Sequence, residues 1–281
     1  MQKIALITDS ACDLDLNKLK ENNINLLPLR IIYSNGDYRD RIDISPQEVY
    51  DNLEKEVPKT SLPSAQETEE ILNKLEEEGY THVICISISS GLSGSFNALR
   101  LALEDHPKLT SFVYDSKILA YPQGEIVLEV AKLIKEGKSY EEIVREIPEI
   151  RKRVIGYFTI NTLEYLKRGG RIGRLAGTVG ELLNLKPIIT TDEDGVYYNV
   201  AKVRGRKQSL SKMTELLKGY LAKGKCEVAV LHAGCEDEAI KYMNSLKDLT
   251  NVVSIKIAEI SPALGIHGGP GLIGFSVKMV K

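Results

Sequence analysis

The sequence predicts an α/β protein with two domains: an N-terminal parallel-sheet domain and a C-terminal α+β domain with a mainly antiparallel sheet. Its 281 residues have the length of about two domains, and 43% of them are hydrophobic, enough to form real cores. Strand and helix signals alternate in the first half, which is typical of parallel sheets, whereas a hairpin signal appears in the second. We therefore predict domains at residues 1–155 and 156–281.

Short apolar runs and capping signals define the elements of the predicted N-terminal domain. The run at residues 81–88 is nearly continuous in β-branched side chains, as expected of a strand buried on both faces. Ser45 and Ser64 each stand three residues before a glutamate, so each predicts a helix start, and Asn35-Gly36 predicts a tight turn. Further strands are predicted at 4–8, 26–33 and 111–114, and further helices at 94–103, 126–135 and after Ser139.

The second half is expected to combine a β-hairpin with helices and further strands. Asp192-Glu193-Asp194-Gly195 is a turn signal between two strand-like runs at 187–191 and 196–203, which predicts an antiparallel pair. Such a mixture favours an α+β arrangement. The other predicted strands are 154–160, 227–232, 252–258 and 272–277, and the predicted helices are 207–221 and 236–246.

Composition and charge argue against several function classes. The chain has 37 basic and 39 acidic residues, a net charge of −2, whereas nucleic-acid-binding proteins usually carry a basic excess. No apolar run approaches the roughly 18 residues that a membrane span needs, and the first residues are expected to form a strand rather than a signal peptide. The four cysteines form no Cys-x-x-Cys pair, which predicts reduced thiols and a cytoplasmic protein.

Three polar clusters, at residues 60–64, 89–95 and 267–271, stand at the edges of predicted elements. They contain hydroxyls, one imidazole and backbone amides, but no carboxylate. The second cluster follows a buried strand and precedes a helix, the place where open α/β sheets bind ligands and where helix amides favour an anion. His267 is expected in a tight loop before the last strand. The clusters predict a site for an anionic headgroup, although turns and helix caps would explain each cluster singly.

A serine hydrolase is the enzymatic alternative. The segment Gly91-Leu92-Ser93-Gly94-Ser95 differs from the Gly-x-Ser-x-Gly nucleophile elbow only in its last residue. His267 would be the base, but a triad also needs a carboxylate that orients the histidine, and none is adjacent to it in the sequence. Because sequence does not show which residues meet in space, this alternative stays open.

A basic segment, Lys167–Arg174, carries four cationic side chains and the helix-breaking pair Gly169-Gly170. Arg171 could offer a guanidinium fork to a carboxylate or phosphate, while a solvated surface loop is the simpler interpretation. The chain lacks the glycine motifs of nucleotide-binding loops and the histidine or cysteine spacings of metal sites. We therefore expect no nucleotide, metal or redox cofactor.

Taken in order, these motifs resemble those of the DegV family of bacterial fatty-acid-binding proteins, and the resemblance covers essentially the whole chain. Two positions differ from the family pattern: Leu62 stands where Gln is common, and Gly268 where a larger residue is usual. Both are expected to reshape the mouth of the pocket and affect chain preference. The matching motifs are Thr8-Asp9-Ser10 with Asp13-Leu14, Thr60-Ser61-x-Pro63-Ser64, Ser89-Ser90-Gly91-Leu92-Ser93-Gly94, Asp115-Ser116, Leu163-Glu164-Tyr165-Leu166 with Gly169-Gly170-Arg171-Ile172, Leu185-Lys186-Pro187-Ile188 and His267-x-Gly269-Pro270-Gly271.

The resemblance implies a long-chain fatty acid held between the two domains. The residues it assigns to the fatty-acid carboxylate are Thr60, Ser61, Ser93 and His267, with the Gly94 amide as a further donor. In bacteria such proteins are the non-catalytic, lipid-carrying subunit of a fatty acid kinase, in which a separate ATP-binding subunit phosphorylates the bound carboxylate for phospholipid synthesis.

By resemblance and by charge, the basic segment would guide the kinase subunit or contact the incoming phosphate. The residues concerned are Arg171, Lys167, Arg168 and Arg174. The partners expected are thus the fatty acid and the kinase subunit, with no nucleic acid and no membrane span, and with transient contact at a membrane surface compatible with the role. A lipid-sensing regulator without a catalytic partner is a third hypothesis.

Overall fold

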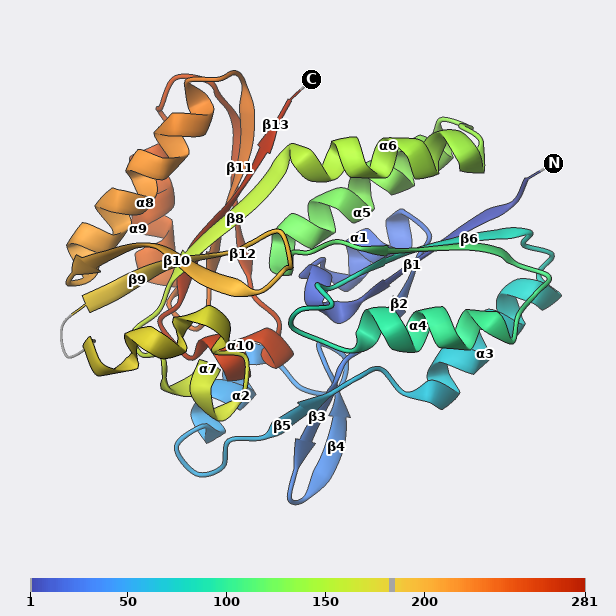
Figure 1. Ribbon diagram of the computed structural model, residues 1–281, viewed down its shortest axis with the longest axis horizontal. Helices are drawn as coiled ribbons and strands as arrows, with labels where there is room; N and C mark the ends of the chain where they lie inside the picture. The colour runs from blue at the N-terminus through green and yellow to red at the C-terminus, as the bar shows by residue number, and fades with distance from the viewer. Residues whose placement is uncertain (1, 182–184, 281) are drawn as a thin grey trace.

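The computed structural model describes residues 2–181 and 185–280, and its two larger sheets lie side by side along the long axis of the molecule (Figure 1). The N-terminal sheet has the order β2-β1-β6-β7, with every neighbouring pair parallel. This confirms the predicted parallel α/β sheet. Its strands are β1 (Ile4–Asp9), β2 (Ile24–Leu27), β6 (His82–Ser87) and β7 (Thr110–Asp115).

Helices cover both faces of this sheet because successive side chains of a strand point to opposite sides. Ala5 and Ile7 of β1 pack in one core with α3 (Ala65–Glu77) and α4 (Ser95–Glu104). Leu6, between them in sequence, packs on the other side, in the core that includes α5 (Ala120–Lys135). The other helical segments of this half are η1 (Ser10–Cys12), α1 (Leu16–Glu21), α2 (Pro46–Asn52) and α6 (Tyr140–Lys152).

The C-terminal sheet has the order β10-β9-β8-β13-β11-β12 and is antiparallel except for the pair β11–β12. This confirms the mainly antiparallel α+β arrangement, including the predicted hairpin. The strands are β8 (Val154–Thr159), β9 (Leu185–Thr191), β10 (Tyr197–Arg204), β11 (Cys226–His232), β12 (Val252–Glu259) and β13 (Ile273–Met279), and the helical segments are α7 (Glu164–Arg168), η2 (Gly173–Glu181), α8 (Arg206–Leu221), α9 (Glu236–Leu246) and α10 (Pro262–Gly268).

One face of the C-terminal sheet is covered by α8 and α9, and the other faces the N-terminal half (Figure 1). Helix α5 contacts both large sheets, and a single core contains side chains from each of them. The predicted boundary between residues 155 and 156 falls inside β8. The division into domains at that position stays a prediction. None of the helices within the described residues is long and apolar enough to cross a membrane.

The structure corrects three local predictions. The apolar run 26–33 is not one strand: it is interrupted at Pro28, which has no amide hydrogen to donate, so that β2 joins the parallel sheet and β3 (Arg30–Tyr33) a separate one. The separate sheet has the order β4-β3-β5 and was not predicted; β4 is Gly36–Arg39 and β5 is Lys59–Ser61.

The other two corrections concern expected loops. His267 lies in the last turn of α10, not in a loop, because Ser261 caps a short helix that begins at Pro262. The basic segment is also partly helical, since Arg168 ends α7 and Gly173 begins η2. By contrast, the helix starts predicted at Ser45 and Ser139 are confirmed, and both have complete capping boxes.

Candidate functional site

The polar clusters converge on a cavity, open to solvent, between the N-terminal sheet, the small sheet and α10. Strand β5 contributes hydroxyls, the loop after β6 contributes Ser93, and α10 contributes an imidazole. Residues more than two hundred positions apart in the chain therefore share one wall. The lining residues are Leu29, Thr60, Ser61, Leu62, Ile88, Leu92, Ser93, Leu119, Arg171, Tyr197, Ala263, Leu264 and His267.

His267 is held against Thr60 by a hydrogen bond of 2.7 Å between Nε2 and Oγ1. Burial, and then the nearby Arg171 guanidinium, lower the pKa of His267 to about 4, so the ring is neutral at physiological pH. Its Nδ1 atom is buried and has no hydrogen-bond partner among the described residues. Gly169 packs against this side of the ring, where an added Cβ would stand 2.0 Å from Nδ1.

Ser93 lies just before α4, whose first-turn backbone amides have no partner within the helix ladder. Its Oγ atom is 2.9 Å from Ser95 Oγ and accepts a hydrogen bond of 3.3 Å from the Ser95 amide. Gly94 is the N-cap residue and has no Cβ to shield its amide; an added Cβ would contact Leu62 at 3.4 Å. Gly94 itself is not among the lining residues, while Ser61 is, although its side chain is exposed.

Arg171 lies in the cavity wall rather than on the outer surface. Its Nε atom donates to Leu92 O at 3.2 Å and its Nη1 atom to Gly169 O at 2.6 Å. These two bonds fix the plane of the guanidinium beside Ser93 and His267. A fixed cationic plane is suited to a carboxylate or phosphate oxygen.

The other cations of the basic segment lie outside the cavity. Arg168 pairs with Glu164 in α7, while Arg174 pairs with Asp192 at 3.0 Å and with Asp194 at 2.6 Å. The Lys167 side chain is exposed, near Asn161 and Leu185 in a separate open groove. The structure therefore splits the predicted basic cluster into one cavity residue and three surface residues.

A second, mainly apolar cavity adjoins the first. Three residues, Leu119, Tyr197 and Leu264, line both cavities, so the two cavities are adjacent and share a wall. The remaining walls come from α5 and the residues before it, from the C-terminal sheet, and from α7, α10 and their neighbouring residues. They comprise Ile118, Ala120, Pro122, Gly156, Tyr157, Phe158, Leu166, Thr190, Thr191, Leu231, Ile260, Gly268 and Leu272.

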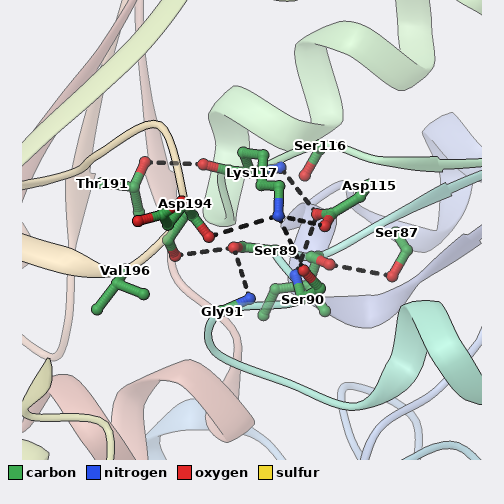
Figure 2. A network of polar contacts seen from close by, with 12 residues as sticks. Ser87, Ser89, Ser90, Gly91, Asp115, Ser116, Lys117, Thr191, Asp194 and Val196 are labelled. Carbon is green, nitrogen blue, oxygen red and sulfur yellow. Dashed lines mark hydrogen bonds and ion pairs between the residues drawn. The ribbon is translucent and has the colours of Figure 1, made fainter.

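The β9–β10 hairpin closes against the loop that carries Ser93 (Figure 2). Ser89 Oγ donates to Gly195 O at 2.8 Å and accepts from the Gly91 amide at 3.1 Å. Lys117 adds an ion pair to Asp115 at 2.8 Å and a contact of 3.5 Å to Asp194 O. These contacts hold the C-terminal sheet against the edge of the N-terminal sheet, beside the polar cavity.

Sequence reasoning missed several wall residues. Tyr197 and Leu264 line both cavities, yet neither stands in a local sequence motif. A weak signal existed for α10, because Ser261-Pro262 has the capping serine and first-turn proline of a helix start. That signal would have placed His267 on a helix and its neighbour Leu264 on the same element.

Fold and site together define an α/β protein of two large sheets and one small sheet, with a polar cavity beside an apolar one. The chain belongs to the DegV family: residues 3–279 match the family described as "Uncharacterised protein, DegV family". The resemblance that the motifs indicated is thus confirmed.

Relatives and solved structures agree with this assignment. A DegV domain-containing protein of Clostridium perfringens is 51% identical over 278 residues, 99% of each chain. DegV of Bacillus subtilis, described as a fatty acid binding protein, has a TM-score of 0.92 and 31% identity, with 100% of both chains covered. A DegV family protein from Thermus thermophilus, whose structure is described by its fatty acid binding, has a TM-score of 0.92 and 29% identity over 99% of this chain and 100% of that one.

Proposed function

We propose that this protein binds a long-chain fatty acid with its hydrocarbon tail in the apolar cavity and its carboxylate in the polar one. The observation that carries the proposal is the adjacency of a polar and an apolar cavity, which share the lining residues Leu119, Tyr197 and Leu264. Fatty acid binding by the two structural relatives supports it. Burial of a tail contributes about 0.8 kcal/mol per methylene, so the tail supplies most of the affinity and the polar residues its orientation.

The polar cavity supplies neutral donors for the carboxylate. We propose that Thr60, Ser61 and Ser93 donate through their hydroxyls, with the Gly94 amide and the His267 ring near the same oxygens. The low pKa of His267 supports a neutral partner there. Neutral donors orient a carboxylate while leaving one oxygen nucleophilic.

We further propose that the bound carboxylate is presented to a separate ATP-binding kinase subunit, which converts it to an acyl phosphate. In this proposal Arg171, in the cavity wall, contacts the incoming phosphate, and the surface cations Lys167, Arg168 and Arg174 guide the subunit. A role in supplying phospholipid synthesis would place the protein in the cytoplasm, with transient contact at the membrane surface where the lipid is exchanged.

The geometry of the site differs from that of a serine hydrolase. In the described chain His267 bonds to Thr60 through Nε2, and its Nδ1 has no carboxylate partner. A triad instead needs the base bonded to the serine and oriented by a carboxylate. Turnover of a generic ester that disappears in Ser93→Ala would nevertheless overturn the carrier proposal.

Mass spectrometry of the gently purified protein tests the proposed ligand. A co-purifying long-chain fatty acid, with its carbon count and unsaturation, is the expected result. No lipid after purification, together with no binding of added fatty acid, would refute the proposal. Addition of a kinase subunit, ATP and fatty acid then separates a kinase carrier from a lipid sensor, because a sensor would yield no acyl phosphate.

A further inference from the structure

The motif near the start of the chain, Thr8-Asp9-Ser10 with Asp13-Leu14, is not explained by contact with the headgroup. Ser10 and Asp13 belong to it, and both are buried, in or beside η1 at the carboxyl end of β1. Neither residue lines the polar cavity. Asp13 instead accepts a hydrogen bond from the segment that leads into α10, and Ser10 is linked to α10 through Asp40.

Asp40 links this motif to α10. The residue follows β4 directly and has no exposed surface. Its Oδ2 atom accepts from Ser10 Oγ at 2.5 Å, and its Oδ1 atom accepts from the Ala263 amide in the first turn of α10 at 2.9 Å. Ser10 Oγ in turn accepts from the Leu29 amide at 3.0 Å, so the hydroxyl has both a donor and an acceptor partner.

A second buried pair holds the residues just before the helix. Asp13 Oδ1 accepts from the Ser261 amide at 2.8 Å and from Arg41 Nη2 at 3.2 Å. The same Arg41 nitrogen donates to Glu259 O at 2.6 Å. The chain from Glu259 to Ala263 is therefore held at three backbone atoms by side chains of the N-terminal half.

These contacts bear on His267 because α10 spans only residues 262–268. A helix this short moves as one unit, so its first turn sets the position of its last. The other partner of the Thr60–His267 bond depends on the same support: Thr60 lies on β5, which pairs with β3, and β3 pairs with β4, at whose end Asp40 stands.

We propose that Asp40, supported by Ser10, is a positioning residue that holds α10 so that His267 meets Thr60 in the geometry that receives the fatty-acid carboxylate. The proposal rests on the proposed function of the cavity. Ser10, in the Thr8-Asp9-Ser10 motif, would then help to align the headgroup site. Asp40 touches no ligand atom and acts through α10.

The test compares Asp40→Asn and Ser10→Ala with a matched control, Glu125→Gln. Glu125 is also a buried carboxylate that accepts from a serine hydroxyl, Ser276 Oγ, but it lies on α5 and faces β13. Asp40→Asn keeps the side-chain shape and an acceptor for the Ala263 amide, while its NH₂ group no longer accepts from Ser10. Circular dichroism and thermal unfolding show that each variant is folded.

The first readout is the NMR titration of the His267 ring, assigned with His267→Asn. We expect a pKa near 4 in the parent protein and in Glu125→Gln, and a pKa raised toward the ordinary value in Asp40→Asn and Ser10→Ala, because a displaced ring is more hydrated. Arg171 is the charged neighbour that also lowers this pKa, and it is unchanged in all variants.

The second readout is the affinity for a sixteen-carbon fatty acid. A weakening of about tenfold is expected for Asp40→Asn and Ser10→Ala, the loss of roughly one headgroup hydrogen bond, and no change for Glu125→Gln. An unchanged His267 titration in both variants, or an equal change in the control, overturns the proposal. If the parent protein binds no fatty acid, the proposed function fails, and the NMR titration still decides whether Asp40 positions His267.

Discussion

At the scale of single residues, His267 shows how the fold selects one protonation state. The ring is enclosed between Gly169 and Thr60, and Arg171 adds a positive charge nearby. Burial and like charge both disfavour the imidazolium, so the pKa falls to about 4. A neutral ring can donate or accept one hydrogen bond without forming a competing ion pair.

This low pKa predicts a contribution to pH-dependent stability. In the unfolded chain the histidine pKa is about 6.5 and in the fold about 4, so the unfolded state binds more protons between these values. The free energy of unfolding should therefore fall by up to about 3 kcal/mol as the pH decreases from 6.5 to 4.

Urea unfolding across that pH range checks this expectation, with His267→Asn as the comparison. The variant should lose the part of the pH dependence that comes from His267. Parallel stability curves for the two proteins would contradict a lowered pKa at this residue. Carboxylates that titrate in the same range affect both proteins equally, so only the difference between the curves is interpreted.

A second residue-scale prediction concerns Arg171, whose guanidinium lies in the cavity wall. Arg171→Ala should leave fatty acid affinity within a few fold, because the tail supplies most of it, and should reduce acyl phosphate formation by about 10- to 100-fold, the loss of a charge-assisted hydrogen bond. Equilibrium binding and a kinase assay measure the two effects.

The control for this substitution is Arg100→Ala, which removes an exposed arginine paired with Glu104 on α4. The control should alter neither measurement. Equal losses of binding and phosphorylation in Arg171→Ala would instead make Arg171 a ligand of the carboxylate itself. The position of Arg171 in the cavity makes this a direct test of two distinct roles.

At the scale of elements, the β9–β10 hairpin depends on close backbone approach. Gly195 has φ +75°, and an added Cβ would stand 1.9 Å from Ser89 Oγ. Gly79 has nearly the same backbone, φ +76°, with no atom within 4 Å of an added Cβ. The two glycines therefore separate the cost of a positive φ from the cost of lost packing.

Alanine at either position should destabilise the protein, but by different amounts. Gly79→Ala should cost about 1–2 kcal/mol of unfolding free energy, the cost of a left-handed alanine, and Gly195→Ala should cost a further 1–3 kcal/mol or so because it forces the hairpin away from the loop. Denaturant unfolding measures both. Equal costs would show that the hairpin contact is not tight in solution.

Elements differ in how far the sequence predicts them. Helices with strong caps, such as those after Ser45 and Ser139, and the β-branched strand β6 follow from local chemistry alone. The small sheet does not, because β5 is three residues long and gains its order from pairing with β3. The same limit applies to the site: motifs identify Thr60, Ser93 and His267, but only the packing of α10 brings Leu264 to the cavity.

At the scale of the whole molecule, α5 of the N-terminal half and the C-terminal sheet line one apolar cavity, so both halves of the chain contribute to it. The N-terminal half contributes Ile118, Ala120 and Pro122, while β8, β9 and β11 contribute about half of the opposite wall. Hydrogen bonds such as that from Ser89 Oγ to Gly195 O hold the two halves together beside the polar cavity. Changes to the apolar cavity should therefore affect affinity, and changes to the polar cavity the orientation of the headgroup.

This separation predicts that tail length and headgroup contacts contribute independently. Shortening the fatty acid by two methylenes should weaken binding about tenfold, since each buried methylene contributes about 0.8 kcal/mol. Ser93→Ala should weaken binding by a similar factor at every chain length, because the lost hydrogen bond, about 1.5 kcal/mol or more to a charged group, is remote from the tail.

Calorimetric titration of parent and variant with fatty acids of several lengths gives both slopes. Parallel lines of log Kd against carbon number are expected, because distant, independent contributions add. A variant whose slope differs from that of the parent would show that Ser93 controls the depth of the tail, and would contradict a tail held only by apolar contact.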